Sequence, residues 1–174
     1  MKTLSKSKIS IIIIIAAALC EACGYRFAEQ RGFPGETERL FVNVLENQTQ
    51  ETGVENIITE ALLNELTLRK THHLANGMAD ADVIMSGVVR HVDIRTVSTR
   101  RSTVADERRV IVSIDLKLTQ SDGRTTWAAR EITDFEEYFV DPNPEISAAN
   151  RQNAIRILSK RMAERVLNRF SDDF

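Results

Sequence analysis

Apolar and polar residues follow one another with different periods along the chain, and these periods predict its elements. Residues 39–45 (RLFVNVL) form a short run rich in β-formers, which predicts a strand. Over residues 54–70 apolar positions recur at steps of three and four, which predicts an amphipathic helix. The tetrapeptide TGVE fits a capping box, so we expect Thr52 and Glu55 to begin this helix.

After this helix the period changes to two. Residues 83–97 and 110–119 alternate as two strands, and residues 125–140 predict the return strand after an Asp-Gly hairpin turn. In the return strand the alternation slips between Trp127 and Phe135, which indicates a bulge.

A long closing helix completes the pattern. Asn143 and Pro144 look like an N-cap followed by proline at the first helical position, and one apolar face runs from Ile155 to Phe170. The element order β-α-β-β-β-α predicts an α/β fold (an α+β sandwich) in which two helices pack on one face of a four-stranded mixed sheet. The opposite sheet face must meet water or a polar partner, because it carries Ser113, Asp115 and Lys117.

The first residues have the layout of an export signal. Three lysines precede an apolar stretch over residues 11–20, which is shorter than the roughly 20 residues that span a bilayer. A cysteine after such a stretch, with a small residue before it, resembles the lipobox of bacterial lipoproteins. Cys23, preceded by Ala22, fits that pattern better than Cys20. We therefore expect residues 1–22 to be a signal peptide.

Acylation of Cys23 would tether the protein, because two or more fatty chains hold a protein stably to a bilayer. By the same resemblance, Gly24 in place of an aspartate indicates the outer membrane. No other cysteine follows Cys23, so no disulfide framework exists. No linker or repeat interrupts residues 23–174, which we expect to form a single domain.

The charge balance excludes one class of partner. The 174-residue chain has a formal net charge of −2, and without residues 1–22 it keeps 20 basic and 24 acidic residues, or −4. Such a chain has no basic excess to favour nucleic acid. It can still bind an anion through a local basic patch.

Candidate chemistry for an enzyme is sparse. The body has no cysteine nucleophile, nucleophile elbow or phosphate-binding glycine loop, and Gly87 lies in a strand, where it indicates close packing. The acidic residues Asp134, Glu136 and Glu137 could suit a cation or paired-carboxylate catalysis, but a solvated edge strand is favoured. We expect no enzyme, metal or cofactor, because no metal-ligand spacing connects the three histidines, His72, His73 and His91.

The segment that connects the second and third predicted strands carries several arginines, and the acidic residues within it are Asp106 and Glu107. Arginine binds phosphate in a bidentate manner, and a hairpin end holds guanidinium groups away from the body. The alternative is a solvated loop whose charge prevents aggregation. The residues themselves leave both interpretations open: Arg95, Arg100, Arg101, Arg108 and Arg109.

Four segments, in this order, carry a resemblance to a known family: CGYRF (23–27), FVNVLEN (41–47), ADVIMSG (81–87) and FEEY (135–138). Together they resemble the lipopolysaccharide-assembly lipoproteins, the LptE family. The likeness covers nearly all of residues 23–174.

The resemblance implies a fold of two helices on a four-stranded sheet and a lipid-anchored protein on the periplasmic side of the outer membrane. It also implies two partners: the outer-membrane β-barrel LptD, which such proteins plug, and lipopolysaccharide. The second basic position of the family, after the last strand, has no clear match, since Ala148 and Ala149 stand there and Arg151 is the nearest basic residue. The candidate lipopolysaccharide contacts are Arg100, Arg101, Arg108 and Arg109.

Three functions remain open at this point. The first is the translocon plug. The second is a regulatory lipoprotein that activates a cell-wall synthase, since such domains share the strand-helix-strand opening. The third is an envelope enzyme that acts on lipid or glycan. Copurification of a stable barrel would separate the first two, and turnover of an envelope substrate would indicate the third.

Overall fold

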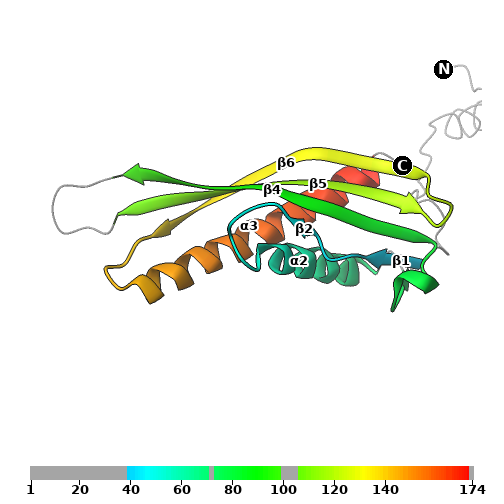
Figure 1. Ribbon diagram of the computed structural model, residues 1–174, viewed down its shortest axis with the longest axis horizontal. Helices are drawn as coiled ribbons and strands as arrows, with labels where there is room; N and C mark the ends of the chain where they lie inside the picture. The colour runs from blue at the N-terminus through cyan, green and yellow to red at the C-terminus, as the bar shows by residue number, and fades with distance from the viewer. Residues whose placement is uncertain (1–38, 71–72, 99–105, 173–174) are drawn as a thin grey trace, which may run out of the picture. The chain divides into compact units, whose positions relative to one another are not determined.

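A computed structural model describes residues 39–70, 73–98 and 106–172 of the chain (Figure 1). The element order is strand-strand-helix-strand, a short 3₁₀ turn at Met78–Asp80, three long strands and a long helix. Their bounds are β1 (Arg39–Val42), β2 (Glu46–Asn47), α2 (Val54–Arg69), β3 (His73–Leu74), β4 (Val83–Ser98), β5 (Glu107–Gln120), β6 (Thr125–Phe139) and α3 (Pro144–Asp172).

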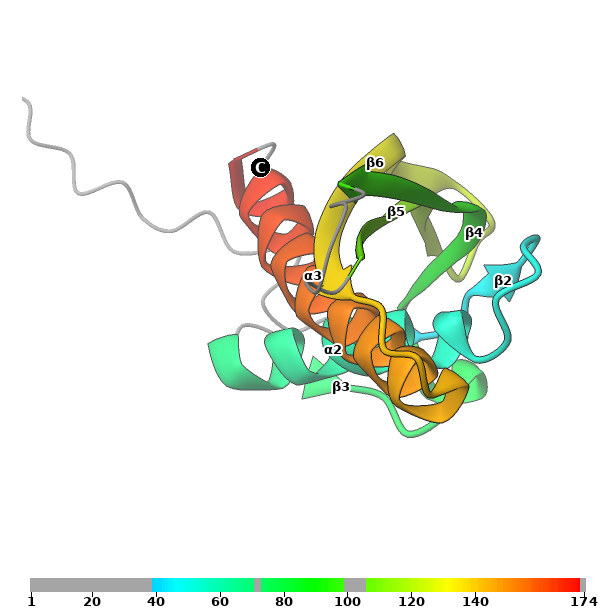
Figure 2. The same cartoon turned by 90° about the vertical axis from the view of Figure 1, so that its left-hand side faces the viewer.

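The strands form one mixed sheet with the order β3-β1-β4-β5-β6, and β2 pairs with β4 beyond the end of β1. β1 and β2 run parallel to β4, whereas β4, β5 and β6 are antiparallel. Figure 2 shows both helices on the same side of the three long strands. The predicted fold class is therefore confirmed.

The strand count differs from the prediction because the first strand is interrupted. Asn43 donates its N–H to the carbonyl of Met85, after which the chain turns and buries Leu45 (2% exposed). The N–H of Leu45 donates to Thr59 Oγ1 on α2 at 3.2 Å instead of to a strand. This contact separates β1 from β2, and the two-residue β3 adds a sixth strand.

The start of α2 corrects the predicted capping box. Gly53 is the N-cap residue with φ +84°, and no side chain caps this end. Glu55 instead accepts a hydrogen bond from Asn47 Nδ2 at 2.8 Å, so its carboxylate holds the preceding loop. The left-handed backbone at the cap suits glycine, and Thr52 has no capping role.

The start of α3 and the last hairpin agree with the prediction. Asn143 Oδ1 accepts the N–H of Glu145 at 2.9 Å, and Pro144 is the first helical residue. Between β5 and β6 the turn has Gly123 at φ +87°, a conformation that favours glycine.

The bulge in β6 lies within the expected window. Ile114 pairs with Ile132 but Leu116 pairs with Ala129, so β6 carries one extra residue there. Glu131, in the bulge, has φ +53°. This extra residue reverses the inward-outward alternation and explains the slip in the sequence pattern.

The core lies between the sheet and the two helices. Trp127 on β6 meets Phe170 on α3 edge to face, with ring centroids 5.2 Å apart. Within the described residues no helix is long and apolar enough to span a membrane. The inward-facing residues of β5 are all buried, namely Val110, Val112, Ile114, Leu116 and Leu118.

Candidate functional site: the sheet face away from the helices

The described arginines of the β4–β5 hairpin do not form one cluster. Arg95 pairs with Arg109 across the two strands, so these side chains share the sheet face away from the helices. Arg108 lies on the other face, because successive strand residues point to opposite sides, and its side chain is exposed. Arg100 and Arg101, which connect the strands, lie outside the described residues, as does Cys23.

Arg109 is engaged by its own sheet. Its Nη2 and Nε contact Glu137 Oε1 on β6 at 2.5 and 3.1 Å. Its guanidinium also lies over the ring of Phe135, 4.3 Å from the centroid. Arg95 is held more loosely by Asp93, through Nε at 2.7 Å, and stays 69% exposed. Two of the predicted phosphate ligands, Arg108 and Arg109, lie within the described residues 39–70, 73–98 and 106–172. Of these two, Arg108 has no ion-pair partner among those residues.

A polar groove of ≈ 710 Å³ lies on the same face, across β4, β5 and β6. In its middle, Thr133 Oγ1 donates to Ser113 Oγ at 3.1 Å, next to the exposed His91. The groove offers hydroxyl, imidazole, carboxylate and guanidinium groups to solvent. This agrees with the prediction that the open sheet face is polar.

Asp115 is the best-anchored acid of this groove. Its Oδ1 accepts the backbone N–H of Glu131 in the bulge at 2.9 Å, and its Oδ2 accepts Arg90 Nε at 2.9 Å. The backbone hydrogen bond, followed by the bond and charge of Arg90, lowers the pKa of Asp115 from its ordinary value. The carboxylate is therefore held ionised, which suits a fixed polar surface rather than an acid catalyst.

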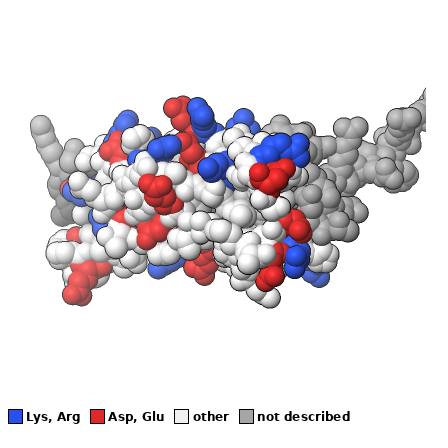
Figure 3. Space-filling view, turned by 45° about the vertical axis from the view of Figure 1, so that its right-hand side comes forward, with Lys and Arg blue, Asp and Glu red and all other residues white. Residues whose placement is uncertain are grey.

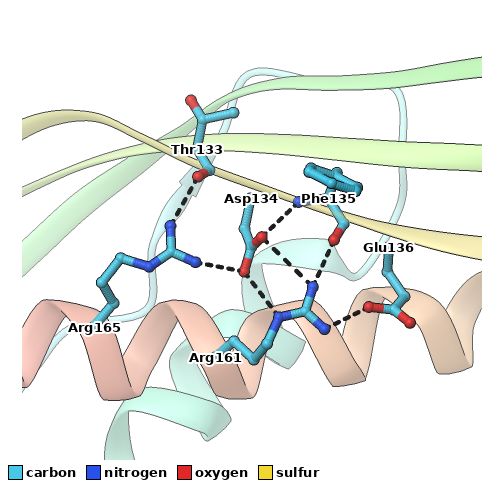
Figure 4. A network of polar contacts seen from close by, with 6 residues as sticks. All are labelled: Thr133, Asp134, Phe135, Glu136, Arg161 and Arg165. Atoms are coloured by element: carbon cyan, nitrogen blue, oxygen red, sulfur yellow. Dashed lines mark hydrogen bonds and ion pairs between the residues drawn. The ribbon is translucent and has the colours of Figure 1, made fainter.

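The acidic cluster of β6 corrects the sequence-based interpretation. Asp134 is buried (8% exposed), not solvated, because the bulge turns it toward α3. It accepts hydrogen bonds from Arg161 Nε at 3.2 Å and Arg165 Nη2 at 2.8 Å (Figure 4). Glu136 accepts from Arg161 Nη1.

These contacts attach α3 to the edge of the sheet. The bonds to Glu136 and then to Asp134 raise the pKa of Arg161 above its usual value, so it stays charged. Arg161 and Arg165 also donate to the carbonyls of Phe135 and Thr133. The arginines are spaced i, i+4 on one helix face, a signal that the sequence contained.

Basic and acidic side chains are interspersed on the face seen in Figure 3.

Arg151, the nearest basic residue to the unmatched family position, is itself paired with Glu51 at 3.2 Å. In the part of the chain that the structure describes, no group of three histidine, cysteine or acidic side chains could hold a metal ion.

The fold of this chain is similar to that of bacterial lipoproteins whose structures have been solved. A lipoprotein from Caulobacter crescentus has 16% identity and a TM-score of 0.52, and the match covers 74% of this chain and 88% of that one. Rare lipoprotein B from Shewanella oneidensis has 14% identity and a TM-score of 0.51, over 76% and 95% of the two chains. At these identities the likeness shows the fold alone.

The family follows from the sequence. The lipopolysaccharide-assembly family, LptE, matches residues 37–170, and the chain belongs to this family. The protein is thus a membrane-associated lipoprotein of the lipopolysaccharide-assembly type, in a family without enzymatic activity. No curated protein matches the chain in sequence.

Proposed function

We propose that this chain is the outer-membrane lipoprotein that plugs an LptD-like β-barrel and assists the insertion of lipopolysaccharide into the outer leaflet. Membership of the LptE family over residues 37–170 is the observation that carries this proposal. The same residues form the sheet and helices described above.

The surface of the domain suits the inside of a barrel. The interior of a large membrane barrel is polar, so a plug needs charged and hydroxyl groups toward its wall. Here the sheet face away from the helices carries the pair Arg90–Asp115 and the hydroxyls of Ser113 and Thr133. Pairing within this surface limits the cost of removing its charges from water.

Lipopolysaccharide would be contacted at the connected end of β4 and β5. The acidic residues nearest in sequence, Asp106 and Glu107, are outnumbered there by arginines. Arg108 is free of ion pairs among the described residues and can turn to a phosphate, whereas Arg109 must first leave Glu137. We assign the phosphate contacts to Arg100, Arg101 and Arg108, with Arg109 as a weaker contributor.

The anchor is the acylated thiol of Cys23, after removal of residues 1–22. Several acyl chains hold such a protein to the periplasmic side of the outer membrane. We expect Cys23→Ser to release the protein from the membrane fraction and Cys20→Ser to leave it there. Release by Cys20→Ser alone would place the processing site there.

Binding of lipopolysaccharide by the full chain tests the arginine assignment. We expect Arg100→Ala with Arg101→Ala, and separately Arg108→Ala, to weaken binding roughly ten-fold, since a charge-assisted hydrogen bond is worth about 1.5–3 kcal/mol. For Arg109→Ala we expect a smaller loss of binding, because its guanidinium is already paired with Glu137. Arg124→Ala, also exposed but at the opposite end of β5, is the matched control. Equal binding by all variants at moderate salt would contradict the assignment.

A further inference from the structure

The two long edges of the sheet are finished differently. On the outer edge of β6, α3 covers the strand, and the carbonyls of Thr133 and Phe135 accept hydrogen bonds from Arg165 and Arg161. These bonds occupy acceptors that an added strand would need. The β6 edge is therefore protected against strand addition.

The outer edge of β4 is covered over its first half alone. β1 pairs with β4 at residues 83–85 and β2 at residues 88–89. From Arg90 to Ser98, β4 pairs with β5 and with no other strand of the described chain. The far side of this half has no strand beside it among the described residues.

The register fixes which backbone groups point outward at this open edge. Val89 directs its carbonyl toward β2, where it accepts the N–H of Gln48 at 3.0 Å. A register shift between Val89 and His91 then reverses the alternation. Beyond that shift, the N–H and C=O groups of Val92, Ile94 and Thr96 point away from β5. The next shift follows Thr96, so we call residues 91–96 the open window of β4.

The open window lacks the usual protection of an edge strand. Proteins protect such edges with lysine, proline or a covering element, and residues 91–96 contain neither lysine nor proline. A groove of ≈ 500 Å³ lies beside the window, between it, the loop of residues 48–51 and Arg151. There is thus space for another segment at this edge.

The groups at the open window match an extended polypeptide better than they match a lipid headgroup. Val92, Ile94 and Thr96 each offer one donor and one acceptor, repeated every second residue, as another strand does. An ionised phosphate offers acceptors alone, so it would leave the three outward carbonyls without a donor. Addition of a strand is the recognition mode that satisfies all six groups.

We propose that the open window of β4 binds an extended segment of the barrel-forming partner, which adds a strand to this sheet inside the barrel. This inference rests on the proposed function and deepens it. A plug loses water along its surface, and unsatisfied backbone groups are costly once water is removed. Strands of the barrel wall already pair with their neighbours on both sides, so the added strand comes from a segment outside the wall.

The side chains of the window specify the added strand. Ile94 is 37% exposed and lies on the helix side of the sheet, because it pairs with the buried Val110. Asp93 and Arg95 lie on the opposite face and are 51% and 69% exposed. We therefore expect alternating residues in the partner segment: an apolar one opposite Ile94, an acidic one opposite Arg95 and a basic one opposite Asp93.

A proline at the centre of the window separates backbone pairing from side-chain contact. The N–H of Ile94 points away from β5, so Ile94→Pro keeps the β4–β5 ladder but removes a donor that the added strand needs. Ile94→Ala, the matched control, loses the side chain and keeps the N–H. We expect Ile94→Pro to lower the amount of barrel recovered per full-length chain about ten-fold, and Ile94→Ala at most about two-fold.

The parent chain shows which of the two proposals fails. If no barrel accompanies the parent chain from outer membranes in mild detergent, the proposed function fails. If the barrel accompanies the parent and Ile94→Pro equally, the strand addition is overturned and the proposed function stands. Equal losses for Ile94→Pro and Ile94→Ala also overturn it, because the side chain alone would then carry the contact. Urea unfolding of each variant checks that the domain is folded.

A photo-crosslink tests the same contact without relying on the proline variant. We expect p-benzoylphenylalanine at position 94 of the full chain, irradiated in isolated outer membranes, to form an adduct with the barrel chain. Mass spectrometry of the adduct should place the linked residue in a segment outside the wall strands. No adduct, or an adduct within this chain, with a second copy of it or with a wall strand, overturns the proposal.

Discussion

Arg161 on α3 donates its Nε to Asp134 Oδ2 on β6 at 3.2 Å, and this bond joins residues 27 positions apart in the sequence. The acid is almost fully buried, while the arginine side chain is 41% exposed. Arg165 adds a second bond to the same carboxylate. One acid thus attaches the closing helix to the edge of the sheet.

Removing that acid should destabilise the domain more than removing a neighbouring one. Asp134→Ala leaves two guanidinium groups without their buried partner, and we expect the free energy of unfolding to fall by about 2 kcal/mol. Glu137→Ala, on the same strand but in an exposed ion pair, should cost less than about 1 kcal/mol. Urea unfolding measures both. Equal losses would show that Asp134 is not the main attachment.

Acid should weaken the fold through Asp115. Its pKa is lowered in the folded protein, so its contribution to stability is present above the ordinary value of about 3.9. That contribution is lost as the pH falls through the lower, folded-state pKa. Asp115→Asn cannot titrate, and its stability should depend less on pH between about 5 and 2.5. Urea unfolding at several pH values across that range measures this dependence. If the free energy of unfolding of both proteins changed equally with pH, the assignment to Asp115 would be refuted.

Gly87 should tolerate no side chain. A Cβ atom built there would lie 2.5 Å from the carbonyl oxygen of Asp115 and 2.5 Å from Leu116 Cδ2. Gly87→Ala must shift β4 against β5, which costs about 1–3 kcal/mol. Gly77→Ala is the matched control, since no atom lies within 4 Å of its added Cβ. Thermal unfolding should show a lower midpoint for Gly87→Ala alone, and an unchanged midpoint would contradict the close approach.

Local rules predicted the elements that depend on local contacts. The Asn143 cap, the glycine turn before β6 and the two-residue period of β5 each involve neighbours within a few positions, and all three are confirmed. The close packing of Gly87 also follows from its place inside a strand. The capping box failed because Gly53 itself supplies the bend and Glu55 is used by Asn47.

The errors arose where distant segments meet. The sequence predicts solvated acids on β6, because nothing in that strand shows that α3 supplies Arg161 and Arg165. Counting inward positions from Ile132 after the bulge would have placed Asp134 toward the core. The prediction of one arginine cluster fails for a related reason. Arg108 and Arg109 are neighbours in a strand, so their side chains point to opposite faces of the sheet.

The most direct test of the central claim is what accompanies the full-length, acylated chain when it is purified from outer membranes in mild detergent. The account predicts an LptD-like β-barrel in near-equal amount, together with lipopolysaccharide. Recovery of the chain without any barrel protein, or with a cell-wall synthase in its place, would contradict it.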